Sequence, residues 1–218
     1  MKPINAQRTL QLAWFGTGIT LGFAVFNGVY GLLYQSIWYG VFAFYYLVLS
    51  GQKTWLLLDN YRVGRRWADN PYRLARARQR IYRLHGIILL PLTLALIVLI
   101  TIILSLTKPD VTGEIIAITI ATYTTYKITI AIINLCRAKK LSHPVLQALR
   151  NLNLVEALTA IIMLESTLIT SFGTLDTSMR VIIIISGAVV CGFNLVLATL
   201  MIIKGSRTLL GNSDLPTA

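Results

Sequence analysis

The sequence is poor in charge for its length. Only 13% of its 218 residues are Asp, Glu, Lys or Arg, about half of the ~25% that a soluble domain usually carries. Hydrophobic residues make up 56% of the chain, and they come in long blocks rather than in alternation with polar residues. This pattern leaves no room for a sizeable soluble domain and predicts a polytopic membrane protein.

Residues that carry chemistry are also scarce. The two cysteines, Cys136 and Cys191, both fall in predicted spans and indicate neither a disulfide framework nor a metal site. The two histidines, His85 and His143, are far apart and lack metal-ligand spacing. No nucleophile elbow, zinc-protease helix or phosphate-binding loop occurs. We therefore expect no enzyme activity and predict no cofactor or metal. Residues 1–11 are short and polar, so no signal peptide is expected.

Six apolar stretches are long enough to cross a bilayer, which predicts an all-α bundle of six transmembrane helices. Consecutive spans joined by short connections predict three hairpins. The spans cover residues 12–33, 37–58, 87–106, 115–136, 152–172 and 181–203.

We expect residues 1–218 to form one transmembrane domain. Within it, residues 62–85 form a basic loop that carries an amphipathic helix, and residues 208–218 form a flexible C-terminal tail. Of the 20 Lys and Arg residues, 16 fall on one side of the predicted spans, two on the other and two inside spans. Such a positive-inside bias predicts a cell-membrane protein with both termini in the cytoplasm.

The chain also has the pattern of a threefold internal repeat of about 70 residues. Arg8, Arg80 and Arg150 introduce the odd spans with similar tails, and Lys53, Lys127 and Asn194 fall in register in the even spans. The alternative is that any helical hairpin with basic ends produces this pattern. Repeats are common in transporters, whose sites lie where the repeats meet.

Lys127 is the most unusual residue in the sequence, because it is a charged side chain within a predicted membrane span. It lies near the middle of the fourth span, ~15 Å from Arg137 at the expected water boundary. A charge at that depth costs at least ~2.5–3.5 kcal/mol unless a partner or a water pocket receives it. Lys53 lies at a similar depth in the second span. Both lysines are therefore candidates for a functional site.

Two acids in the fifth span can form ion pairs with these lysines. Glu156 is expected ~9 Å deep and Glu165 ~22 Å deep, so that Lys127 falls between them in height. Two buried bases and two buried acids would then balance. One interpretation is a polar cavity that binds a solute or ion, with Lys127 and Glu165 as its charged centre. The other is one or two structural ion pairs that fix helix register.

Three further residues are candidates for the lining of such a site. Tyr123 and Tyr126 follow the helical spacing of the face that carries Lys127, and Asn194 is an amide within the sixth span. Their hydroxyl and amide groups can hydrogen-bond a solute, or can simply bond to neighbouring helices.

Two surfaces are candidates for contacts with other molecules. Asn70 and Pro71 signal the start of an amphipathic helix whose arginines would meet anionic lipid headgroups or an acidic partner. These arginines are Arg73, Arg76, Arg80 and Arg83. Gly18 and Gly22 in the first span form a GxxxG pair, suited to packing within the monomer or to docking a membrane partner. Nucleic-acid binding lacks a supporting fold or aromatic platform.

Three hairpins resemble mitochondrial carriers in outline, but the proline and charge signature of that family is absent. Size and topology are similar to the substrate-binding subunits of energy-coupling-factor importers, without a shared motif. Neither resemblance assigns residues. The sequence therefore predicts a membrane protein that binds or transports a small solute or ion. The alternative is a non-transporting subunit that docks a partner.

Overall fold

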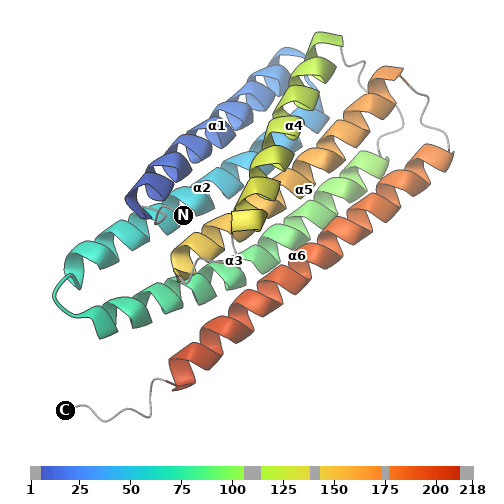
Figure 1. Ribbon diagram of the computed structural model, residues 1–218. Coiled ribbons are helices and arrows are strands. Elements are labelled where there is room, and N and C mark those ends of the chain that lie inside the picture. Colours follow the sequence, from blue (N-terminus) through green and yellow to red (C-terminus); the bar gives the residue numbers. More distant parts are fainter. Residues whose placement is uncertain (1–5, 106–113, 138–142, 173–176, 212–218) are drawn as a thin grey trace.

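The computed structural model describes residues 6–105, 114–137, 143–172 and 177–211, and these residues form six α-helices (Figure 1). The helices are α1 (Ala6–Leu33), α2 (Ile37–Arg66), α3 (Pro71–Ser105), α4 (Glu114–Arg137), α5 (Pro144–Phe172) and α6 (Thr177–Gly211).

All six helices are long and apolar enough to cross a membrane. They run side by side as one elongated bundle (Figure 1). Large apolar side chains such as Phe15, Val25, Phe44 and Ile118 point outward and are exposed. Outward apolar surface on this scale requires a non-aqueous surrounding. The chain therefore fits an integral membrane protein in contact with the lipid bilayer.

The first two spans form the predicted hairpin. Gln35 turns the chain with a φ of 48°, and the amide of Ser36 donates to the carbonyl of Gly31 over 3.0 Å. A Cβ atom at Gly31 would lie 2.9 Å from the backbone nitrogen of Gly40. The absence of a side chain at Gly31 thus lets α1 and α2 approach closely.

The arrangement as three hairpins is not confirmed beyond this pair. The main neighbour of α3 is α6, and the main neighbour of α4 is α5 (Figure 1). Along the chain, the α4–α5 pair therefore falls between the two helices of the α3–α6 pair. Three glycines explain the close packing of α3 on α6. Added Cβ atoms would lie 2.8 Å from Met201 at Gly86, 2.8 Å from Ile100 at Gly187 and 2.7 Å from Arg83 at Gly205. Small residues bring helices together where lipid offers no hydrophobic drive.

The centre of the bundle is α5. It packs against α2, α3, α4 and α6, and the hydroxyl of Thr20 also links it to α1. The α5 span is the most buried of the six. Most side chains in the middle of α5 therefore face other helices rather than lipid.

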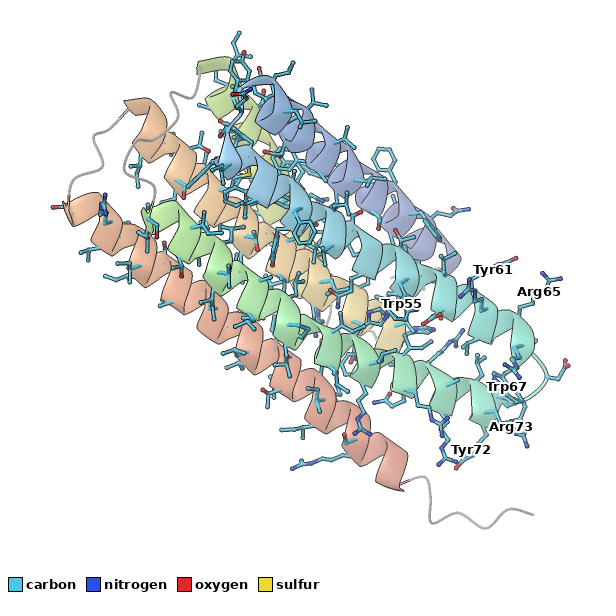
Figure 2. All side chains as sticks on the ribbon, turned by 180° about the vertical axis from the view of Figure 1, so that it is seen from behind. Trp55, Tyr61, Arg65, Trp67, Tyr72 and Arg73 are labelled. Carbon is cyan, nitrogen blue, oxygen red and sulfur yellow. The ribbon has the colours of Figure 1, made fainter. Side chains whose placement is uncertain are left out.

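Many of the described arginines lie at the end of α2 and the start of α3, at one end of the bundle, which we call the basic end. It holds the turn between α2 and α3 and the last turns of α6. Figure 2 shows Arg65, Trp67 and Arg73 around that turn. The helix α3 begins where the sequence predicts, because the Asn70 side chain accepts a hydrogen bond from the Arg73 amide over 3.0 Å. It then runs unbroken into the third span.

Two predicted boundaries shift. Only residues 67–70 of the expected basic loop are non-helical. At the C-terminus α6 continues through Gly211, four residues into the predicted tail, and residues 212–218 lie outside the described part of the chain.

Candidate functional site

Three charged side chains from three helices meet in the interior of the bundle. Glu156 on α5 is fully buried and forms ion pairs with both Lys53 on α2 and Lys127 on α4. The Lys127 ammonium lies 2.7 Å from Glu156 Oε1, and Lys53 contacts Glu156 Oε2. Lys53 is 1% exposed and Lys127 5% exposed, so neither ammonium reaches the surface of the bundle. We call these three residues the charged cluster.

Neutral donors complete the surroundings of the Glu156 carboxylate. The hydroxyl of Tyr123 donates to Oε1 over 2.7 Å, and the hydroxyl of Thr20 on α1 donates to the same oxygen over 2.6 Å. Together with the two lysines, four donors satisfy a carboxylate, which has about four acceptor positions. Glu156 is thus held ionised by contacts from α1, α2 and α4.

The lysines have partners of their own. Lys53 Nζ donates to Asn153 Oδ1 over 2.7 Å, and Lys127 Nζ donates to Thr20 Oγ1 over 2.9 Å. Lys127 also lies 5.2 Å from the ring centroid of Tyr123 and 5.8 Å from that of Tyr126. At these distances an aromatic face attracts an ammonium.

Aromatic rings pack around the charged cluster. The Tyr123 ring stacks on Phe23 with centroids 3.5 Å apart, and Tyr46 meets both rings edge-on. Tyr45 accepts a hydrogen bond from Thr159, one turn beyond Glu156 on α5. Apolar walls of this kind lower the local dielectric and strengthen each electrostatic contact inside.

The predicted charge pairing needs one correction. Glu165 is not among the described partners of either lysine, and its carboxylate accepts a hydrogen bond from Ser186 on α6 over 2.6 Å. It follows Glu156 by nine residues, which is ~14 Å along the helix, farther than a lysine side chain reaches. The expected balance of two bases with two acids therefore fails at the charged cluster, where two bases share one acid.

The other predicted lining residues lie at varying distances from the charged cluster. Tyr123 is in direct contact, whereas Tyr126 is partly exposed and offers only its ring to Lys127. Asn194 is fully buried on α6, and its amide has no hydrogen-bond partner among the described residues. The described hydrogen bonds and ion pairs of Lys53, Lys127 and Glu156 go to α1, α2, α4 and α5 rather than to α6.

Sequence reasoning missed Thr20 and Asn153. Asn153 precedes Glu156 by three residues and so shares its helix face, a spacing that could have revealed it. Thr20 gives a weaker signal, because it is one hydroxyl among the glycines of the first span.

A pocket of about 310 Å³ lies elsewhere, between α2 and α3 near the end opposite to the basic end. None of its lining residues belongs to the charged cluster. They are Ile37, Ile97, Val98, Thr101, Ile102 and Ser105.

Comparison of the chain with protein-family models, with curated proteins and with solved structures found no match. The geometry of the charged cluster is therefore the basis for any functional assignment.

Proposed function

We propose that this membrane protein binds or transports a small solute or ion at the charged cluster of Lys53, Lys127 and Glu156. One observation carries the proposal. Two ammonium groups and one carboxylate converge from three helices at a point where all three are buried. Ionisable groups within a membrane are costly, and they commonly mark the path of a substrate or ion.

A purely structural ion pair accounts less well for this arrangement. A single lysine would neutralise Glu156, and a buried pair is often no more stabilising than apolar packing. The second lysine adds another charge that must be removed from water. In our proposal this second lysine serves the solute, and the protein acts without catalysis.

The internal repeat gains some support from the same contacts. Lys53 and Lys127 stand at matching positions of the proposed repeat of about 70 residues, and both meet Glu156. We propose that duplication supplied the second lysine.

Thermal-shift screening of the purified protein against neutral, cationic and anionic solutes tests the proposal. We expect a ligand of the charged cluster to stabilise the wild type and Glu165→Gln, but not Lys127→Met. Glu165→Gln is the matched control, because it removes a charge from the same helix outside the charged cluster. A ligand that stabilises all three proteins equally would place its site elsewhere.

A second candidate function is docking of a membrane partner, and the exposure of the GxxxG pair favours it. Gly18 and Gly22 face outward, and a Cβ atom at either position would meet nothing within 4 Å. Packing within the monomer therefore does not use them. Cross-linking in native membranes, compared between wild type and Gly18→Ile, tests this docking. Unchanged cross-links would exclude this face.

We further propose that the basic end faces the cytoplasm of a cell membrane, with both termini on that side. The arginines of α3 would then contact anionic headgroups, each with ~1 kcal/mol of attraction. The test is to measure how much anionic lipid stays bound to the protein through purification. The wild type is compared with a variant that carries Arg73→Gln, Arg76→Gln, Arg80→Gln and Arg83→Gln. Equal retention would argue against this contact.

A further inference from the structure

The charged cluster carries one positive charge more than it neutralises. Glu156 is the single acid in described contact with Lys53 and Lys127. The other acid of α5, Glu165, bonds to Ser186, and Asp59 on α2 lies 3.9 Å from Arg62. The remaining described contacts of the lysines are with neutral groups on Thr20, Asn153 and the two tyrosine rings.

Hydrogen-bond donors also outnumber acceptors there. The four donors on Glu156 use its acceptor positions. Each ammonium has three N–H groups, and the structure gives each lysine two hydrogen-bond acceptors. The hydroxyl of Tyr46, in a fully buried side chain beside Tyr123, has no described partner.

From this excess of charge and of donors, we infer that the solute of the charged cluster is a small monovalent anion bound by the ammonium groups of Lys53 and Lys127. The inference rests on the proposed function and specifies its substrate class. One negative charge restores neutrality, and uncompensated charge in a low-dielectric interior is strongly unfavourable. A cation would instead meet two ammonium groups at short range.

The surroundings limit the size of the anion. Tyr123, which donates to Glu156, stacks on Phe23, and Tyr46 packs edge-on against both rings, so bulky aromatic groups lie next to the charged cluster. The class that suits such a site is a halide, nitrate or a short carboxylate. Such an anion would share the lysines with Glu156, whose carboxylate already presents the same chemistry to them.

The inference is tested by thermal unfolding of the detergent-purified protein in chloride, nitrate or acetate. Gluconate serves as the bulky reference anion, and the ionic strength is held constant. Three proteins, the wild type and two variants, differ in the net charge of the cluster. It is +1 in the wild type, zero in Lys127→Met and +2 in Glu156→Gln. We expect the half-saturating anion concentration to fall at least tenfold in Glu156→Gln, and the anion response to disappear in Lys127→Met.

Several outcomes would overturn the inference. One is an equal anion response in all three proteins, and another is the absence of any response in Glu156→Gln. The absence of a response in Glu156→Gln would mean that one lysine loses its proton and so lowers the charge. Measurement of the protons released when this variant folds would detect that loss. If Glu156→Gln does not fold in any anion, Lys53→Met supplies a second neutral cluster, and it must also lose the response.

The same experiment separates this inference from the proposed function. A neutral or cationic solute that stabilises the protein in a Lys127-dependent manner would overturn the anion assignment and leave the binding function intact. If no solute of any charge acts through Lys127, both fall. Exchange of sodium for potassium at constant chloride is the control, and it should leave the melting temperature unchanged.

Discussion

Glu156 and Glu165 lie nine residues apart on α5, yet their surroundings differ. Glu156 is fully buried and accepts four hydrogen bonds or ion pairs from α1, α2 and α4. Glu165 is only partly buried, and its described partner is the hydroxyl of Ser186 on α6. Both are acids within one membrane span. Only Glu156 faces the side of α5 where several helices converge.

This difference teaches that depth in the membrane alone does not define a site. Glu165 was expected to be the deeper acid, and it has the simpler environment. Glu156 differs because its charge is paired and hydrogen-bonded by residues from helices distant in sequence. A change at Glu156 therefore acts on the packing of four helices, whereas a change at Glu165 acts on one contact.

The largest effect that this comparison predicts is on stability. Glu156→Gln leaves two buried ammonium groups without a counter-charge, which should cost ~3–5 kcal/mol of unfolding free energy. Glu165→Gln keeps a polar partner for Ser186 and should cost about 1 kcal/mol or less. Unfolding in detergent with gluconate as the sole anion measures both. Equal losses would remove the distinction between the two acids.

The next prediction concerns the two lysines. Lys53→Met or Lys127→Met alone leaves one lysine paired with Glu156, so each should cost only the lost hydrogen bonds of the removed ammonium, ~1 kcal/mol. The double variant leaves a bare buried carboxylate and should lose ~3–5 kcal/mol, more than the sum of the single losses. A double-mutant cycle measures this coupling. Additive losses would show that the lysines do not share Glu156.

A smaller effect should follow from moving α1. Gly31→Leu would push α1 away from Gly40, at a cost of ~1–3 kcal/mol, and would draw Thr20 away from Glu156. Gly18→Leu on the same helix meets open space and should cost less than ~0.5 kcal/mol. Thermal unfolding compares the two. A larger loss for Gly18→Leu would mean that α1 packs differently.

The last prediction concerns His143, which directly precedes α5 and lies outside the spans. Burial lowers the pKa of His143 to about 4, and the positive charge of Arg78 acts in the same direction. The ordinary value is ~6.5, so the unfolded chain takes up this proton first as the pH falls. Stability is therefore complete above pH ~6.5 and is lost as the pH falls toward 4.

Replacing His143 by Gln should abolish this part of the pH dependence. The difference in melting temperature between the variant and the wild type should change by a few degrees between pH 7 and pH 4.5. If the two proteins lose stability in parallel, His143 does not titrate in that range. The result also checks, outside the membrane, how strongly burial without a counter-charge disfavours an ionised side chain.

The sequence by itself determined the six spans, the basic end and the presence of buried charge at Lys53, Lys127 and Glu156. These follow from hydropathy, length and residue type, which act locally along the chain. It also determined the first hairpin, because three residues between spans leave α1 and α2 no alternative to packing together.

Only the tertiary structure decided which charges meet. Whether Lys127 pairs with Glu156 or Glu165 depends on the rotation and vertical offset of α4 against α5, and hydropathy does not encode either. The pairing of α3 with α6 depends likewise on where glycines on distant segments come to face bulkier residues. That two lysines share one carboxylate emerges only when α2 and α4 pack on either side of the same face of α5, and the proposed anion site depends on that contact.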